Sequence, residues 1–231
     1  MKYSPFLLSL LLMASACYSE PEFPVEPEIS FENVRFIDMP SGQPDTLLVT
    51  VSFQDGNGDL GLRGTEDTPP YHLYDYVFKP DGTYLKIGEF DTLPAYTCNK
   101  YRIGTITGGV FLLDQLNGRD TVYVKPNRFY YNYFADLYRI RNGQEILVDY
   151  AAESGSSCGE SLNGRLPISM FSSNGSAISG TITRSFGSRG WLVSFANDSL
   201  KIKVRIADRD LNLSNVAESP VFTLRGVQVQ R

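Results

Sequence analysis

Two short segments of the chain place oxygen-bearing side chains at every second position, a pattern that can bind a hard metal cation. In the first, residues 54–62 (QDGNGDLGL), single glycines separate Asp55, Asn57 and Asp59. This spacing lets a tight turn aim alternate side chains and some backbone carbonyls at one point, as Ca²⁺ requires. The alternative is an Asp/Asn/Gly-rich turn that satisfies its own backbone.

The second segment, residues 208–215 (DRDLNLSN), repeats the alternating pattern. Each segment follows a run expected to be a strand, residues 46–54 and 200–207. Loops at the strand ends of an antiparallel sandwich can meet at one pole, where pooled ligands would fill the about six to eight oxygen positions of Ca²⁺. The expected ligands of this structural calcium site are Asp55, Asn57, Asp59, Asp208, Asp210 and Asn212.

The first segment differs from an EF-hand in two respects. If Asp55 is position 1, Glu66 falls at position 12, but Leu60 occupies position 6, where that loop needs glycine. Strands, and not helices, are also expected on both sides. The segment therefore indicates a structural site and not a calcium sensor.

The pattern of the chain predicts an all-β fold, an antiparallel immunoglobulin- or fibronectin-like β-sandwich with an elaborated middle region. Short alternating runs are separated by Gly, Pro and Asn turns, such as Asn142-Gly143. We expect one sandwich domain over residues 29–231, within which residues 83–150 form a candidate insertion. The expected strands are residues 29–38, 46–54, 71–78, 83–90, 101–113 (a bent pair), 121–125, 129–140, 145–150, 165–170, 177–183, 191–195, 200–207 and 221–229.

The composition supports a folded, strand-rich protein and narrows its partners. Of the 231 residues 42% are hydrophobic, and 14 Tyr and 14 Phe favour strands. The formal net charge is −5 with no basic cluster, which argues against nucleic acid as a partner. The single histidine, His72, leaves little basis for zinc chemistry or a histidine base.

The sequence contains no motif that points to catalysis. It has no Gly-x-Ser-x-Gly elbow, no pair of metal-binding histidines and no phosphate-binding loop. Asp75, Asp136 and Asp149 lie on or next to expected strands, and the paired carboxylates of a glycosidase would meet only in space. We therefore expect a protein that is not an enzyme, with a hydrolase as the third hypothesis.

The N-terminus has the features of an export signal. Lys2 precedes an apolar stretch over residues 6–16 that is too short to span a bilayer, and small residues then lead into Cys17. The segment resembles a bacterial lipoprotein signal, with residues 1–16 removed and Cys17 lipidated. An ordinary signal peptide cut near the same place is the alternative.

Residues 17–28 are expected to form an acidic, Pro-rich tether behind the lipid anchor. Its glutamates, Glu20, Glu22, Glu26 and Glu28, resemble the acidic export tags of surface-exposed Bacteroidetes lipoproteins. The expected location is the outer membrane, with the domain facing the periplasm or the cell surface and the membrane contacted through the lipid.

Three cysteines in an exported protein would leave one thiol unpaired. If Cys17 carries lipid, Cys98 and Cys158 remain as a candidate disulfide pair in an oxidising compartment. Two separate thiols are the alternative.

Four Asp-Thr or Asp-Ser dipeptides followed by an aliphatic residue resemble the O-glycosylation sequons of exported Bacteroidetes proteins. The acceptors in these sequons would be Thr46, Thr92, Thr121 and Ser199. The alternative is that Asp-Thr is simply common at strand starts.

Longer motifs carry a family resemblance. DGNGDLGL (residues 55–62), RLP (165–167), GTI (180–182) and IADRDLNLSN (206–215) together resemble uncharacterised Bacteroidetes lipoproteins with an immunoglobulin-like β-sandwich and no established activity. The resemblance covers roughly residues 29–229, but little of residues 83–125. Asp210 departs from it, because a small residue is more usual there.

The leading hypothesis is thus a lipid-anchored, non-enzymatic β-sandwich with a structural calcium site and a glycan or protein partner still to be identified. The rival hypothesis is a carbohydrate-binding surface module. Tyr71, Tyr74, Tyr76 and Trp191 lie near expected strand ends and have rings that can stack on sugars. Packing within the sheets is the alternative role for these rings.

Overall fold

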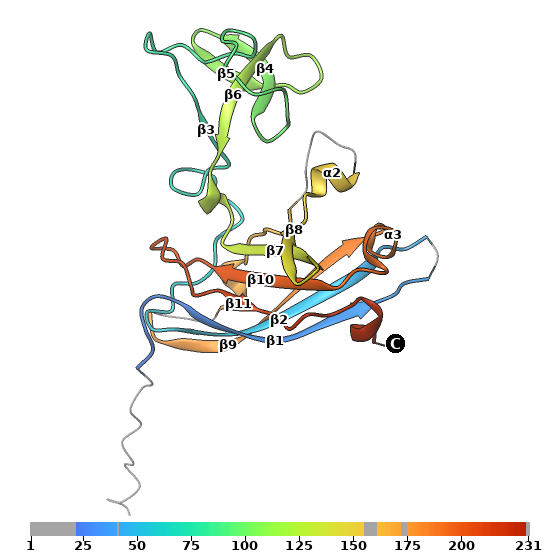
Figure 1. The fold of residues 1–231 in the computed structure, drawn as a ribbon. Helices are drawn as coiled ribbons and strands as arrows, with labels where there is room; N and C mark the ends of the chain where they lie inside the picture. The colour runs from blue at the N-terminus through green and yellow to red at the C-terminus, as the bar shows by residue number, and fades with distance from the viewer. Residues whose placement is uncertain (1–21, 41, 155–160, 172–174, 230–231) are drawn as a thin grey trace, which may run out of the picture.

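The computed structural model describes residues 22–40, 42–154, 161–171 and 175–229, and these fold as an all-β protein with three antiparallel sheets (Figure 1). The first sheet has the order β1 (Glu28–Ile37), β2 (Asp45–Asp55), β9 (Ile178–Ser188). The second has the order β11 (Ala217–Glu218), β10 (Leu200–Ile206), β7 (Tyr133–Arg141), β8 (Gln144–Leu147). The third has the order β3 (Tyr74–Tyr76), β6 (Asp120–Pro126), β4 (Tyr101–Thr107), β5 (Val110–Leu113).

The first two sheets pack face to face around the main hydrophobic core (Figure 1). Alternation along the strands supplies this core, because every second side chain of a strand points to the same face. In β2, Leu47, Val49 and Val51 are fully buried, and in β10 so are Leu200 and Ile202. The predicted strands 46–54 and 200–207 are thereby confirmed within a residue at each end.

The third sheet stands apart from the sandwich and has a core of its own (Figure 1). Phe111, Val122 and Val124 are its buried residues, and the half-buried rings of Tyr74 and Tyr84 pack against them. Residues 56–73 and 127–132 connect this sheet to the sandwich.

The predicted hairpin turn at Asn142-Gly143 is present. Asn142 (φ 52°) and Gly143 (φ 76°) turn the chain between β7 and β8, as a two-residue hairpin of type I′ requires. The expected bent pair over residues 101–113 is the hairpin of β4 and β5.

Several expected strands are absent from the described residues. Residues 83–90 form only isolated bridges, Phe78 to Tyr84 and Lys86 to Val122, so they are not the hairpin partner of β3. Strand structure in residues 71–78 is limited to β3. Residues 165–170 and 221–229 contain isolated bridges and the 3₁₀ turns η2 (Ile168–Met170) and η3 (Arg225–Val227). Short apolar runs without a long partner strand do not sustain a ladder.

The prediction of a strand over residues 191–195 is wrong, because this segment is the short helix α3 (Trp191–Phe195). A helical turn places Trp191 and Phe195 on one face, where both are buried and their ring centroids lie 5.6 Å apart. A strand would also bring positions 191 and 195 to one face, so the apolar pattern alone could not distinguish the two structures. The remaining helices are α2 (Tyr150–Ser154) and the 3₁₀ turn η1 (Arg128–Tyr130), which takes the start of the expected strand 129–140.

Shortening a side chain in the main core is expected to destabilise the whole sandwich. Ile202 has no exposed surface, so Ile202→Ala should lower the free energy of unfolding by about 2–5 kcal/mol in a urea titration. The exposed Val193 provides the control, and Val193→Ala should change that free energy by less than about 0.5 kcal/mol. Equal effects of the two substitutions would contradict this placement of the core.

Candidate metal centre

The two acidic segments meet at one pole of the sandwich. Leu60 and Asp208 form an isolated antiparallel bridge, which pairs the segment after β2 with the segment after β10. Asp55 is the last residue of β2, and Asp208 follows β10 by two residues. Burial of the apolar faces of both strands thus brings carboxylates from distant parts of the sequence together.

The first segment holds buried oxygen atoms that have no hydrogen-bond partner. Asp55 has no exposed surface, and neither of its carboxylate oxygens has a hydrogen bond of ordinary geometry among the described residues, although the nearby backbone N–H groups of Asn57 and Asp59 lower its pKa. Asn57 Oδ1 and Asp59 Oδ1 are also buried and also have no hydrogen-bond partner among the described residues. The other unpartnered buried side-chain atoms in the described chain are the Tyr133 and Tyr150 hydroxyls and Arg184 Nε. Because native proteins rarely bury unpaired polar atoms, four such oxygens within five residues call for a positive partner.

Electrostatics at this pole disfavours the charged carboxylates. Burial, followed by the charges of Asp59 and Asp208, raises the pKa of Asp55 from 3.8 to about 6. Burial, followed by the charges of Asp208 and Asp210, also raises the pKa of Asp59. Burial raises the pKa of Asp208, although hydrogen bonds from Asn212 oppose the effect. A cation would reverse each of these shifts.

The residues of the second segment lie at different depths. Asp208 is buried and accepts hydrogen bonds from the Asn212 backbone N–H and from Asn212 Nδ2, each at 2.8 Å. Asn212 therefore orients the Asp208 carboxylate. Asp210 is exposed, and its charge acts on both Asp59 and Asp208.

The glycines of the first segment permit close backbone contacts. A Cβ on Gly56 would lie 2.3 Å from the Phe23 carbonyl oxygen, and the Gly56 N–H donates to the Pro24 carbonyl oxygen at 2.7 Å. Gly61 has φ 93°, and a Cβ there would lie 2.6 Å from Ile168 Cα. The chain before β1 and the turn η2 thus pack directly against the candidate metal loop, which a larger residue would prevent.

Three residues that were not among the predicted ligands hold neighbouring segments at the site: Asn215, Arg209 and Glu66. Asn215 Oδ1 accepts from the Ile29 N–H and Asn215 Nδ2 donates to the Ile29 carbonyl oxygen, both at 2.8 Å, so the second segment holds the start of β1. Arg209 binds both carboxylate oxygens of Glu66, at 3.0 and 2.5 Å. Alternating side chains in the sequence could indicate ligands, but not these contacts across the fold.

Glu66 is the residue that the EF-hand count placed at position 12. Its hydrogen bonds with Arg209 hold the pKa of its carboxyl below the usual value, so its charge is already paired. Arg165 Nη2 donates to the Arg63 and Glu66 carbonyl oxygens, which further anchors residues 63–66 to the sandwich.

The donor set agrees better with Ca²⁺ than with a transition metal. No group of three or more His, Cys, Asp or Glu side chains in the described part of the chain forms a recognisable metal cluster. The oxygens collected here come from an amide as well as from carboxylates, and Ca²⁺ sites commonly combine these groups with backbone carbonyls.

The aspartates of three candidate glycosylation sequons have structural contacts. Asp45 accepts from the Met39 N–H at 2.9 Å, Asp120 pairs with Lys86 at 2.6 Å, and Asp198 pairs with Arg139 at 2.6 Å. These contacts give the aspartates of the Asp-Thr and Asp-Ser pairs a structural role that does not depend on O-glycosylation of the next residue. Thr92 is exposed, and Thr46, Thr121 and Ser199 are half-buried.

The predicted signal peptide of residues 1–16, the predicted lipidation site Cys17 and the first part of the predicted tether lie outside the described residues. Cys98 is disulfide-bonded. The other two cysteines, Cys17 and Cys158, both lie outside the described residues, so the pairing of Cys98 with Cys158 stays a prediction. Among the helices described, none is long and apolar enough to cross a membrane.

The aromatic residues suggested for sugar stacking are mostly engaged. Trp191 is 3% exposed and its Nε1 donates to the Phe186 carbonyl oxygen at 2.8 Å, so Trp191 has the alternative, packing role and not that of a surface platform for sugar. The Tyr71 hydroxyl donates to the Arg209 carbonyl oxygen. Tyr76 packs against Tyr84 and Phe111, and Tyr74 lines a cleft described below.

Two of the three candidate carboxylates for hydrolysis, Asp136 and Asp149, line the same cleft, which is described below, and Asp75 lies outside it. Asp75 contacts His72 at 2.6 Å on the surface, and Asp149 accepts from the Ala152 N–H at the start of α2.

Comparison with known proteins gives no family assignment. No protein-family model, curated protein or solved structure matches this chain.

The raised pKa of Asp55 predicts how stability depends on pH without metal. The folded state binds the Asp55 proton more tightly than the unfolded state, so this contribution to stability is present below about pH 4 and lost as the pH rises through about 6. Asp55→Asn removes the group. In metal-stripped buffer, the variant should therefore gain stability relative to the wild type as the pH rises through this window, measured by urea unfolding. A difference that stays constant with pH would contradict the burial of a charged Asp55.

Proposed function

We propose that this protein is a lipid-anchored, non-enzymatic β-sandwich held outside the cytoplasm, in which one Ca²⁺ ion holds a pole of the fold together. The observation that carries the proposal is the group of four buried, unpartnered oxygens of Asp55, Asn57 and Asp59. Asp208, and at the surface Asp210, add negative charge from the second segment.

A bound Ca²⁺ ion would remove the electrostatic cost of this arrangement. Asp55, Asn57 Oδ1 and Asp59 Oδ1 would hold the ion from the first segment, and Asp208 would contribute from the second. The ion supplies positive charge and accepts several oxygen ligands in flexible geometry, which suits a loop of alternating ligands. Asn212 orients the Asp208 carboxylate through two hydrogen bonds and so acts as a positioning residue.

The position of the site supports a mechanical role. The chain before β1 contacts Gly56, the second segment holds Ile29 through Asn215, and Arg209 holds Glu66 in the connection to the third sheet. Three segments that leave the sandwich in different directions thus converge around Asp55. An ion there would hold the N-terminal segment and the third sheet to the same pole.

The strand order supports the immunoglobulin-like part of the proposal. With the sandwich strands lettered in chain order, β1, β2 and β9 correspond to A, B and E, and β11, β10, β7 and β8 correspond to G, F, C and C′. A sheet with A, B and E opposite a sheet with G, F and C is the arrangement of immunoglobulin-like sandwiches, here without a strand D and with an added C′. In this lettering, the third sheet is an insertion between strands B and C.

The proposed location depends on the N-terminal sequence. Cys17 after an apolar stretch, followed by the acidic tether of residues 17–28, favours a lipoprotein of the outer membrane that faces the periplasm or the cell surface. The proposal of a protein that is not an enzyme depends on the lack of a catalytic motif in the sequence.

Calcium is expected to stabilise the soluble chain of residues 18–231, which contains every described strand. If the calcium concentration is about 100 times the dissociation constant, the stabilisation is about 2.7 kcal/mol, which corresponds to a rise in Tm of roughly 5–10 °C over the same protein in EDTA. Asp55→Asn should abolish this rise and should also raise the Tm in EDTA, because it removes a buried charge.

The control for this measurement is Asp136→Asn, which changes an exposed aspartate outside the two segments and should leave the calcium effect intact. A Tm that does not respond to Ca²⁺, or an Asp55→Asn variant that responds like the wild type, would contradict the proposed site.

The anchor is tested separately in bacterial cells that express the full chain. Cys17 should incorporate radiolabelled palmitate, and Cys17→Ser should abolish the label because the acceptor thiol is lost. Cys98→Ser provides the control and should retain the label. Absence of label from the wild type, with release of a soluble processed chain, would favour the ordinary signal peptide.

A further inference from the structure

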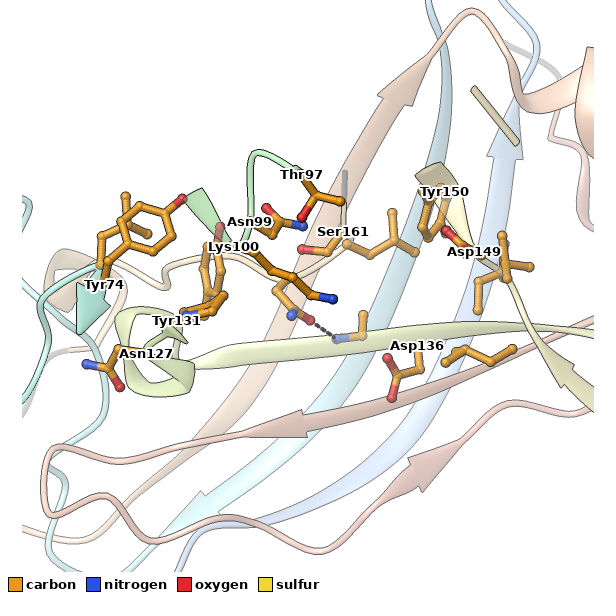
Figure 2. A pocket seen from close by; sticks show the side chains of 18 residues that line it. Tyr74, Thr97, Asn99, Lys100, Asn127, Tyr131, Asp136, Asp149, Tyr150 and Ser161 are labelled. Carbon is orange, nitrogen blue, oxygen red and sulfur yellow. Dashed lines mark hydrogen bonds between the residues drawn. The ribbon is translucent and has the colours of Figure 1, made fainter. Parts of the chain in front are cut away.

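A cleft separates the third sheet from the second sheet and shares no residue with the two metal-binding segments. Its volume is about 820 Å³, within the range of small-molecule sites, which often lie where two substructures meet. Figure 2 shows Tyr74, Asn99 and Lys100 on the side of the third sheet, and Asp136, Asp149 and Tyr150 on the side of the sandwich. Tyr131, just after η1, lines the cleft between them.

Several polar side chains of the cleft remain uncommitted. The side chains of Asn99, Lys100 and Asp136 are exposed and make no hydrogen bond or ion pair with the described residues. Asn163 uses Oδ1 to accept from the Ala135 N–H at 3.1 Å, which leaves its Nδ2 donors. By contrast, Asn127 is occupied, because its Nδ2 donates to the Pro70 and His72 carbonyl oxygens and its Oδ1 accepts from the Phe129 N–H. The cleft thus offers donors and acceptors from both walls.

Tyrosine rings share the apolar surface of the cleft with aliphatic side chains such as Leu137, Val148 and Leu162, and two of the rings contact neighbouring side chains. The ring centroid of Tyr131 lies 5.0 Å from that of Tyr130 in an edge-to-face arrangement. The Arg102 guanidinium lies 3.7 Å from the centroid of Tyr74 and covers one face of that ring. Rigid rings next to free hydrogen-bonding groups suit a ligand with an apolar ring face and polar edges.

The charges in the cleft disfavour an anionic ligand. Lys100 is its one cation among the described residues, against the two carboxylates of Asp136 and Asp149. Phosphate and sulfate sites typically use clustered arginine or lysine. On β5, Val110, Leu112 and Leu113 are adjacent and each more than half exposed, whereas the exposed aliphatic side chains that line the cleft are Leu73 and Leu147. A hydrophobic protein segment would therefore have better contacts at β5 than in the cleft.

We infer that this cleft is a binding site for a neutral oligosaccharide. Tyr131 and the open face of Tyr74 would stack on sugar rings, and Asn99, Lys100 and Asp136 would bind sugar hydroxyls. The inference goes beyond the calcium-stabilised sandwich of the proposed function. It also places the sugar-binding surface away from Trp191, Tyr71 and Tyr76.

The test is a glycan array followed by isothermal titration calorimetry, with residues 18–231 in buffer containing Ca²⁺. The array carries neutral glucans, xylans, mannans and N-acetylglucosamine oligomers, together with sialylated and sulfated glycans. At least one neutral oligosaccharide should bind. Tyr131→Ala should weaken its binding about tenfold or more through loss of stacking, and the exposed Lys100→Ala should weaken it about three- to tenfold.

The matched control is Tyr76→Ala, which removes a tyrosine of the third sheet that lies outside the cleft and should leave the affinity unchanged. The Tm of each variant shows whether it is folded, and Lys100→Ala removes only an exposed side chain. Binding confined to acidic glycans, no binding to any neutral glycan, or equal effects of Tyr76→Ala and Tyr131→Ala would overturn the inference. These readouts are independent of the calcium-dependent change in Tm that tests the proposed function.

Discussion

The buried carboxylate of Asp55 is the constraint around which this structure is arranged. It terminates the central strand of the first sheet, has no exposed surface and has no partner for either oxygen among the described residues. An isolated carboxylate in this position is costly unless it is protonated or paired with a cation. The neighbouring carboxylates of Asp59 and Asp208 increase that cost. The calcium ion proposed here would resolve the conflict and would turn three repelling groups into a point of attachment.

That attachment point lies where the different parts of the chain diverge. The N-terminal segment, the connection to the third sheet and the loop after β10 all contact residues within a few positions of Asp55. The sandwich is stabilised by its own core, whereas the third sheet has a much smaller one. Fixing the pole therefore affects chiefly how the third sheet is held over the sandwich. The cleft lies between these two parts.

Sequence patterns correctly predicted the elements that are specified by a few neighbouring residues. The alternation in β2 and β10 and the Asn142-Gly143 turn specified strands and a hairpin, and the spacing of Asp55, Asn57 and Asp59 marked the loop. Sequence patterns gave the wrong prediction where the structure of a segment depends on which other segment it packs against or pairs with. Residues 191–195 carry apolar positions that fit a strand or a helix, and residues 83–90 alternate but have no long partner strand. Arg209 with Glu66, and Asn215 with Ile29, were missed because these contacts join residues far apart in the sequence. The cleft was missed because its walls come from separate sheets.

The central claim is that a calcium ion occupies the space between the two acidic segments. The most direct measurement is a crystal structure of residues 18–231 grown with Ca²⁺, with anomalous diffraction recorded at a long wavelength. The account predicts one anomalous peak about 2.3–2.6 Å from the oxygens of Asp55, Asn57 and Asp59. A map without an anomalous peak there, in which water or protein donors pair with the Asp55 carboxylate, would contradict it.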